Sequence, residues 1–234
     1  VLKDGTYFKG DLVISNADLY HTETTLIKES KYRSYDKNYW QKVSLAPSAL
    51  IIFLGLNKKV DNISHHNFYF CNDWNLNFKQ IFNYNDLPSN PSFYVSSPSQ
   101  IDDSVAPKNK DLFFILVPVS SGLKLSNDQI TNFKKMIYEK IEEKFDIPNF
   151  KEIIEIERFF LPDDFINKYN SFSGTALGPL HDLRQTLFRP KNKSKNIKNL
   201  YYVGSYVNPG IGMPMVIASA MVTYNKIIKD LMIK

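Results

Sequence analysis

The chain has one cysteine, Cys71, among its 234 residues. It cannot form an intramolecular disulfide, and a lone thiol fits a reducing compartment. The sequence also lacks any run of about 18 apolar residues, the length that a membrane span needs, and it opens on no signal-peptide pattern. We therefore expect a cytoplasmic protein.

An excess of charge of one sign is also lacking, since 29 basic residues stand against 24 acidic ones and the net charge is +5. The lysines are scattered and alternate with glutamates, which argues against a nucleic-acid partner. The pair His65–His66 invites a metal hypothesis, but neighbouring residues on a strand point to opposite faces. No Cys/His spacing elsewhere completes a site, so we expect no metal.

The residues that are present have the proportions of a globular protein, with 43% hydrophobic and 23% charged. The length allows one large domain or two small ones. Aromatic residues make up 14% of the chain. That fraction suits a protein that lines an apolar pocket, and it equally suits an ordinary core.

The first 30 residues predict strand, turn, strand and helix. Asp4–Gly5 signals a tight turn beside the β-prone Thr6–Phe8, and Leu12–Ile14 suits a short buried strand. Ser15–Asp18 is expected to close that strand and to cap a helix from about Leu19 to Ile27. Because the chain starts on valine and on a hairpin strand, we expect it to begin inside a domain.

The middle of the chain predicts a sheet with a helix packed on it. Apolar or β-prone runs mark the strands, and the run at 112–119 is the most continuous, so we place it centrally. Ser126 and Gln129 form a capping box ahead of a long amphipathic helix. Asp163 and Asp164 fit the first turn of a further helix better than acid/base chemistry. The other strands are expected near 49–53, 65–70, 93–95 and 153–160.

The stretch 199–220 holds three of the nine glycines. It predicts a strand at Leu200–Val203, a glycine-rich loop, and a helix entered through Pro214. The N–H groups of Met215 and Val216 are then expected to lack partners within the helix and to offer an anion site. An ordinary strand–loop–helix crossover accounts for the same pattern.

This stretch resembles the carboxy-terminal flavin-contacting segment of the phytoene desaturase family, which comprises carotenoid-forming flavoproteins. The resemblance extends over nearly the whole chain in the family's order, which is more specific than any one motif. The strings that carry it ahead of this segment are Ser15–Asp18 after an apolar strand, Ala46–Ala49, the double histidine, and Gln185–Thr186 with Phe188–Pro190.

The resemblance implies an α/β (α+β) chain, the carboxy-terminal part of an FAD-dependent fold of the amine-oxidase and phytoene-desaturase type. Residues 1–30 would be a returning segment of the FAD-binding domain, and 31–160 a substrate-binding domain with an antiparallel sheet. Residues 161–234 would complete the FAD-binding domain with a strand, loop and helix. The family's amino-terminal Rossmann half, which holds the ADP part of FAD, is expected to be absent from this chain.

The implied activity is removal of hydrogen from phytoene or a related polyene hydrocarbon, with FAD as cofactor. The resemblance assigns no catalytic residue, and it is compatible with peripheral contact at the inner face of the cell membrane. Two alternatives stay open, an inert fragment and a hydrocarbon- or lipid-binding module without redox activity. Within the family, a diapophytoene desaturase, a carotenoid 3,4-desaturase and a carotenoid isomerase stay open. The implied cofactor-binding residues are Asn16, Ala17, Gly204, Ser205, Pro209, Gly210, Gly212, Met213, Pro214, Met215 and Val216.

Overall fold

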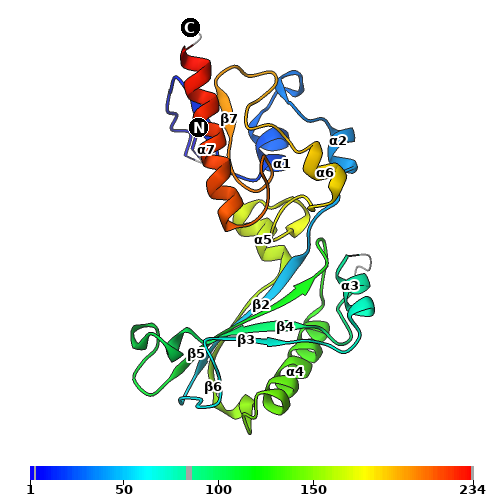
Figure 1. Ribbon diagram of the computed structural model, residues 1–234, viewed down its shortest axis with the longest axis vertical. Coiled ribbons are helices and arrows are strands. Elements are labelled where there is room, and N and C mark those ends of the chain that lie inside the picture. Colours follow the sequence, from blue (N-terminus) through cyan, green and yellow to red (C-terminus); the bar gives the residue numbers. More distant parts are fainter. Residues whose placement is uncertain (3, 83–85, 233–234) are drawn as a thin grey trace. The chain divides into compact units, whose positions relative to one another are not determined.

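A computed structural model describes residues 1–2, 4–82 and 86–232 (Figure 1). The chain divides into two compact units, one built from both ends of the sequence and one from its middle. We call them the terminal unit and the sheet unit. Their roles as cofactor and substrate domains, with the residue limits given above, stay predictions. The terminal unit comprises Val1–Ala46, Tyr169–Phe172 and Leu177–Lys234, and the sheet unit Pro47–Lys168 and Ser173–Ala176.

The sheet unit is built on a five-stranded antiparallel sheet in the order β3-β4-β5-β2-β6. The predicted strands of this region are confirmed, and β5 is the central one, as its continuous apolar run indicated. The strands are β2 (Ser48–Leu56), β3 (His66–Tyr69), β4 (Phe93–Ser96), β5 (Asp111–Val119) and β6 (Ile154–Phe160).

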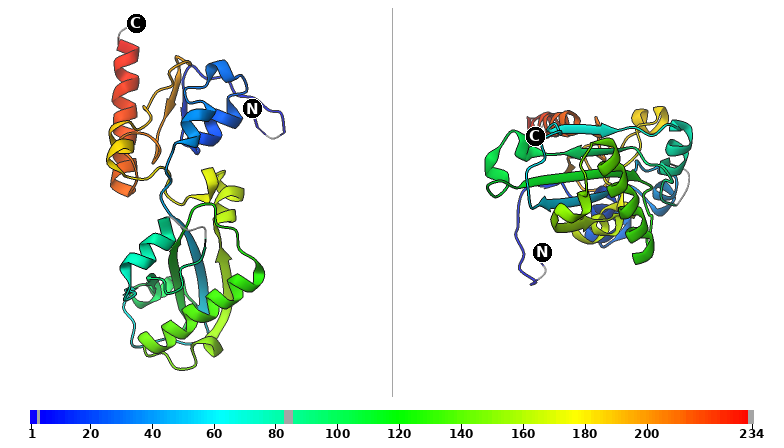
Figure 2. Two further views of the ribbon diagram at one scale, coloured as in Figure 1. Left: turned by 90° about the vertical axis from the view of Figure 1, so that its right-hand side faces the viewer. Right: turned by 90° about the horizontal axis from the view of Figure 1, so that it is seen from below.

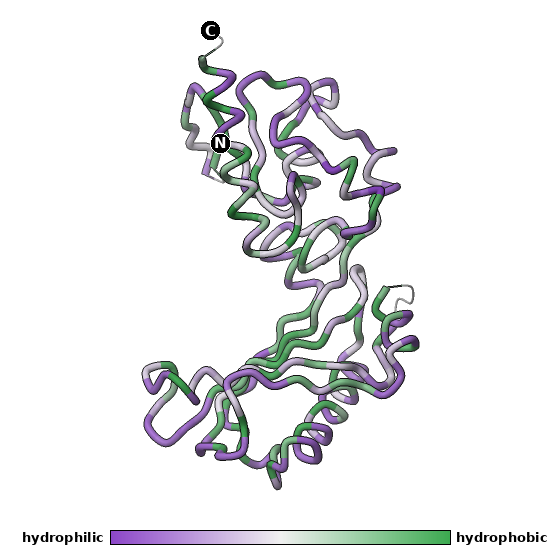
Figure 3. Tube along the Cα trace, in the orientation of Figure 1, coloured by the Kyte–Doolittle hydropathy of each residue, from purple (hydrophilic) through white to green (hydrophobic). Residues whose placement is uncertain are grey.

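Helix α4 (Asn127–Lys144) lies along one face of this sheet (Figures 1 and 2). Its predicted capping box is confirmed, because Ser126 accepts from the Gln129 N–H and the Gln129 side chain accepts from the Ser126 N–H. Apolar side chains of α4 pack on the strand residues that point toward it, and together they form the main core. Figure 3 shows the resulting hydrophobic colour along the strands. Two further helices belong to this unit, α3 (Trp74–Phe82) and α5 (Pro162–Tyr169).

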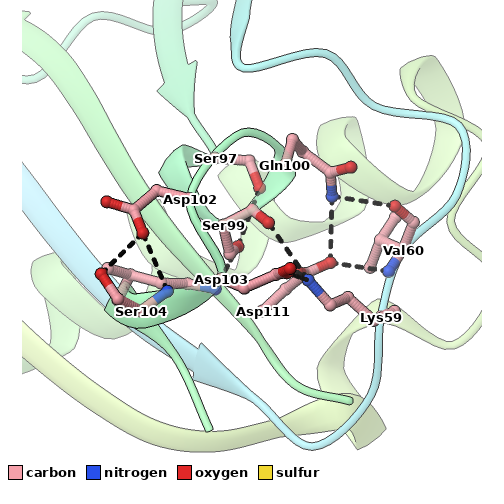
Figure 4. A network of polar contacts seen from close by, with 10 residues as sticks. Lys59, Val60, Ser97, Ser99, Gln100, Asp102, Asp103, Ser104 and Asp111 are labelled. Atoms are coloured by element: carbon pink, nitrogen blue, oxygen red, sulfur yellow. Dashed lines mark hydrogen bonds and ion pairs between the residues drawn. The ribbon is translucent and has the colours of Figure 1, made fainter. Parts of the chain in front are cut away.

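A polar network holds the end of β5 at which Asp111 lies (Figure 4). Asp111 is 1% exposed, and its carboxylate accepts from the Val60 N–H at 2.7 Å and from the Gln100 side chain at 3.1 Å. The Lys59 ammonium lies 3.4 Å from the same carboxylate. Because a buried charge is costly unless it is paired and hydrogen-bonded, these contacts give Asp111 a structural role.

The terminal unit holds a two-stranded parallel sheet, in which β1 (Val13–Ser15) pairs with β7 (Leu200–Tyr202). Its core is a cluster of aromatic rings around Trp40, which is 3% exposed. The helices of this unit are α1 (Leu19–His21), which continues as the π-helix Thr22–Leu26, then α2 (Lys37–Gln41), α6 (Leu183–Leu187) and α7 (Met213–Met232). Short 3-10 turns elsewhere in the chain are Ser30–Tyr32, Pro98–Gln100, Asp103–Val105, Phe150–Ile153 and Phe172–Gly174.

The amino-terminal predictions hold only in part. Asp4–Gly5 does form a turn, with Gly5 at a φ of +88°, but Thr6–Phe8 forms no strand and the predicted hairpin is wrong. Strand β1 is not buried either, since Val13 and Ile14 are each 50% exposed. Asp18 alone caps α1, by accepting from the His21 N–H, whereas Ser15 ends β1 and the Asn16 side chain turns toward Gly204.

The predicted fold class is confirmed, because the chain combines helices with a parallel and an antiparallel sheet. Within residues 1–2, 4–82 and 86–232, no helix has the length and apolar character that crossing a membrane requires. The same residues bring together no group of three or more His, Cys, Asp or Glu side chains suited to a metal ion. The rings of His65 and His66 stack on each other at 3.9 Å, which differs from the opposite orientations expected of strand neighbours.

Candidate cofactor-facing site

Two segments far apart in the sequence meet where β1 and β7 end. Ser15 pairs with Tyr202 in the parallel register, and the Val203 N–H donates to the Ser15 carbonyl at 3.0 Å. A Cβ on Gly204 would lie 3.3 Å from the Asn16 Oδ1 atom. The two predicted cofactor segments therefore leave their strands side by side, at the carboxyl ends where α/β sheets bind ligands.

Buried hydroxyl and amide groups fix the start of the glycine-rich loop to α7. The Gly204 N–H donates to the Ser219 hydroxyl at 3.2 Å, and the Thr223 hydroxyl donates to the Tyr202 carbonyl at 2.8 Å. The Asn192 side-chain amide lies within 3.2 Å of both hydroxyl oxygens. Ser219 and Thr223 are 0% and 2% exposed, so α7 holds β7 through polar contacts.

A buried carboxylate supports β7 from its other side. Glu23 is 0% exposed and accepts from the Ser34 N–H at 2.5 Å and from the Tyr202 hydroxyl. Burial raises the pKa of Tyr202, and its hydrogen bond to Glu23 raises it further. Tyr202 therefore keeps its proton at neutral pH and donates a hydrogen bond to Glu23, which ties β7 to the segment after α1.

Gly210 is required by its neighbours within the chain. Its φ is +128°, and a Cβ there would lie 2.3 Å from the His181 Nε2 atom and 3.0 Å from the Arg189 guanidinium carbon. His181 Nε2 accepts from the Ile211 N–H at 3.0 Å, so it holds the loop on that side. Close packing explains this glycine without any ligand.

The buried guanidinium of Arg189 is hydrogen-bonded to the glycine-rich loop. Its side chain is 5% exposed and donates to the Ser205 carbonyl at 2.8 Å and to the Pro179 carbonyl at 3.5 Å. Its Nε atom has no hydrogen-bond partner among the described residues. Burial lowers the pKa of Arg189, and burial together with the nearby Arg189 charge lowers the pKa of His181. Neutral His181 is the form that can accept the Ile211 N–H.

A cavity of about 310 Å³ lies beside Arg189. Tyr39 lines it, and burial raises the pKa of Tyr39 to about 12. Asp182 also lines it, and hydrogen bonds from Gln185 lower the pKa of that carboxyl group. None of the predicted cofactor residues lines this cavity, so it is separate from the glycine loop.

The start of α7 corrects one prediction. The helix begins at Met213, one residue before Pro214, so Val216 is its fourth residue. The Val216 N–H therefore donates to the Gly212 carbonyl at 2.9 Å and is not free. Among the described residues, no hydrogen-bond partner is found for the N–H of Met215, as predicted, or for that of Met213, which takes the place of Val216.

The surroundings of Gly212 differ from those of Gly210. Gly212 has a φ of +110°, and a Cβ placed there would meet no atom within 4 Å. The space over the helix start is therefore open, and Met213 beside it is 81% exposed. Open space, a left-handed glycine and unpartnered N–H groups at the positive end of a helix together suit an anionic or electron-rich ligand.

The remaining predicted residues lie around this opening. Asn16 and Ala17 are exposed, Ser205 and Pro209 are half-buried in the loop, and Pro214 is exposed in the first turn of α7. The structure thus places all eleven predicted residues in the terminal unit, along two adjacent segments. Their role in binding a cofactor stays a prediction. The residues present fit a flavin, because no atom lies within 4 Å of a Cβ placed on Gly212 and the N–H groups of Met213 and Met215 are of the kind that a flavin edge accepts from.

The sequence did not single out three residues that support this site, although it did place Arg189 in the Phe188–Pro190 string that carries the resemblance. Glu23, Asn192 and Thr223 carried no motif, and their roles depend on contacts with residues far away in the chain. His181 and Arg189 precede the glycine loop in sequence. Gly210 was the available signal, because a glycine at positive φ often marks a close approach of other groups.

The chain is similar to three characterised desaturases over nearly all of its length. It is 36% identical to a carotenoid 3,4-desaturase of Haloarcula japonica, over 94% of this chain and 44% of that protein. It is 31% identical to a lycopene-forming phytoene desaturase of Pantoea ananas, over 98% of this chain and 47% of that protein. It is also 31% identical to a 4,4'-diapophytoene desaturase of Staphylococcus haemolyticus, over 97% of this chain and 48% of that protein.

No protein-family model matches the chain. A solved structure of an oxidoreductase from Methanosarcina mazei is 18% identical, with a TM-score of 0.49 over 95% of this chain and 44% of that one. The chain thus spans about half the length of the curated relatives that it matches, or slightly less.

Proposed function

We propose, on the premise that this chain is homologous to the phytoene desaturase family along nearly its whole length, that it forms the carboxy-terminal part of an FAD-dependent polyene desaturase. The resemblance to that family is confirmed, because relatives 31% to 36% identical cover 94% to 98% of the chain. Their coverage is consistent with a carboxy-terminal portion. The reaction belongs to the proposed whole protein and acts on phytoene or a related polyene.

One observation in the structure carries the proposal furthest. The segments at Asn16 and Gly204 are separated by most of the chain, yet they leave parallel strands side by side. Gly212 then opens onto free space at the start of a 20-residue helix. This arrangement supports a cofactor site at the carboxyl end of β1 and β7.

FAD, when bound, would supply the acceptor for the hydride that leaves an allylic carbon of the polyene. The N–H groups of Met213 and Met215 would donate to the cofactor's electron-rich edge, where the helix dipole favours negative charge. Asn16, Ser205 and the loop glycines would fix its orientation. A hydrocarbon substrate needs few polar groups, and we assign no proton acceptor among the residues of this chain.

The proposal also includes where the protein acts. We propose a cytoplasmic protein that binds peripherally to the inner face of the cell membrane, because a polyene substrate dissolves in lipid. The rival interpretations, an inert fragment and a lipid-binding module without redox activity, predict a protein without flavin.

The first test is the coding sequence upstream of Val1 and the flavin content of its complete product. We expect a strand, a G-x-G-x-x-G turn and a helix upstream, and a purified protein that shows flavin absorbance and converts phytoene in liposomes. An upstream sequence without such a unit, or a colourless and inactive complete protein, contradicts the proposal.

The second test uses Gly212→Val in that complete protein, with Gly122→Val as the matched control. Both glycines have positive φ, at +110° and +80°, and neither has an atom within 4 Å of an added Cβ. The backbone strain is therefore comparable, but Gly122 lies in the sheet unit. We expect Gly212→Val to lower flavin content and to slow turnover about 100-fold, while Gly122→Val leaves both unchanged. Equal behaviour of the two variants would remove Gly212 from the proposed site.

A further inference from the structure

Eight aromatic side chains form a continuous line on the surface of the sheet unit. Neighbouring ring centroids along this line are 5.0 to 6.3 Å apart. Six of the eight rings are 39% to 60% exposed, which is unusual for so many aromatic side chains in contact. We call this line the aromatic track, and in order it consists of Phe53, Phe114, Tyr94, Phe68, Phe70, Trp74, Phe78 and Phe82.

The first half of the track crosses the sheet face that α4 does not cover. Phe53 lies opposite Phe114 across β2 and β5, and Tyr94 lies opposite Phe68 across β4 and β3. An antiparallel sheet with one packed face usually carries polar residues on the other. Here the second face is apolar as well, since β5 places its half-buried Leu112, Phe114, Leu116 and Pro118 there.

The second half of the track continues onto α3. Trp74, Phe78 and Phe82 follow one another at helical spacing, and their rings stack at 5.9 and 6.2 Å. The helix buries Asn77 and Ile81 instead, so its aromatic side is turned to solvent. Phe70 joins the two halves, with its ring 5.9 Å from Phe68 and 5.3 Å from Trp74.

Two ion pairs of this unit lie away from the rings, whereas Arg158 lies on the same face as the track, beside its Phe53 end. Glu157 is paired with Lys134 of α4 on the covered face of the sheet. Asp111 is paired with Lys59 at the end of β5. Arg158, across from Phe53 on β6, donates to a backbone carbonyl. A long apolar surface of this kind suits an uncharged, elongated ligand better than a charged one.

We propose that the aromatic track binds the conjugated chain of a polyene along its length, and that its helical half selects for long polyenes. The proposal rests on the proposed function for the class of ligand. A flat conjugated chain can stack on successive rings, and each ring contributes to the contact. A short polyene contacts only the rings on the sheet, whereas a longer one also reaches Trp74, Phe78 and Phe82.

The test measures ligand binding to this chain alone, without flavin. The probes are cis-parinaric acid as a short polyene and crocetin as a longer one, each added as a dilute solution. The chain has two tryptophans, Trp40 in the core of the terminal unit and Trp74 in the track. We expect crocetin, which reaches Trp74, to quench tryptophan emission, and parinaric acid to bind with little loss of it. In Trp74→Phe, which keeps a ring, the quenching should disappear while the absorbance shift of the bound polyene remains.

Two variants test the role of the helical half. Each ring lost should weaken binding by about 2- to 10-fold where the polyene reaches it. The double variant Phe78→Ala/Phe82→Ala should therefore raise the Kd for crocetin and leave that for parinaric acid nearly unchanged. Phe8→Ala is the control, because Phe8 is 78% exposed and lies in the terminal unit. Stearic acid, which has no conjugated bonds, should compete at least about tenfold less well than parinaric acid.

Several results would overturn the proposal. They are quenching that persists in Trp74→Phe, equal effects of the track and control variants, and binding that appears only with phosphatidylcholine vesicles, which would make the track a membrane contact. A change of oligomeric state in the track variants, without polyene binding in the parent chain, would make a second copy the occupant. Because no flavin or turnover is needed, a failed desaturase assay and a failed binding assay are distinguishable.

Discussion

The two long helices of this protein bury opposite kinds of side chain. Helix α4 buries Phe133, Ile137, Tyr138 and Ile141 against the five-stranded sheet. Helix α7 buries Ser219 and Thr223, while Met213, Ile217 and Met221 on it are 64% to 81% exposed. In the sheet unit, the residues that cover the apolar side of α4 are themselves part of the unit. In the terminal unit, the described residues cover only the polar side of the helix.

The contrast extends to the sheets. Parallel strands are normally buried on both faces, yet within the described part of the chain β1 pairs with β7 alone, and its Val13 and Ile14 are half-exposed. The curated relatives are about twice as long as the chain or longer. The core of the sheet unit is thus formed by its own residues, whereas β1 and the apolar side of α7 are left exposed by the described residues.

The largest effect is expected from matched substitutions in the two helices. Ile137 of α4 is 0% exposed, and Ile217 of α7 is 66% exposed. Ile137→Ala should lower the free energy of unfolding by about 2–5 kcal/mol, since it removes buried methyl groups and leaves a cavity. Ile217→Ala should change it by less than about 0.5 kcal/mol. Urea denaturation of each variant measures both, and a large loss in Ile217→Ala would show that α7 is covered in solution.

A smaller effect is expected from the polar contacts that hold α7. Thr223→Val keeps the shape of the side chain but removes the hydroxyl that bonds the Tyr202 carbonyl and the Asn192 amide. Leaving those groups unpaired should cost about 1–3 kcal/mol in thermal or urea unfolding. Thr131→Val on α4 is the control, because Thr131 is exposed and bonds only the carbonyl one turn earlier. Equal losses would contradict the polar attachment of α7.

The smallest effect is a pH dependence of the glycine loop. The pKa of His181 is lowered from its ordinary value by burial and by Arg189, so the folded state favours the neutral ring. The contribution of the bond to the Ile211 N–H is full above the unfolded pKa of about 6.5 and is lost as pH falls through the lowered folded pKa. An NMR titration of the Ile211 N–H signal follows this loss. In His181→Gln, which keeps an acceptor but does not titrate, the signal should stay constant over the same range.

What could be predicted from the sequence differs between the units for a physical reason. In the sheet unit, the continuous apolar run of β5 and the capping box at Ser126 reflect contacts with partners inside the same unit, so the pattern was sufficient. In the terminal unit, Leu12–Ile14 predicted a buried strand, but burial depends on what lies against it. The start of α7 was misplaced by one residue because Pro214 is acceptable at either of the first two positions of a helix. That single residue decided which N–H groups are free.

The pairing of β1 with β7 has a consequence for how the protein folds. These strands lie near opposite ends of the chain, so the whole sheet unit is an insertion between the two halves of the candidate site. Contacts of such high sequence separation form slowly, because the closure entropy of the intervening loop is lost before the contact stabilises anything. A sheet unit that has already folded shortens that loop. The inserted unit is therefore expected to fold first. Its folding brings the two ends of the intervening chain closer, so that β1 and β7 pair last.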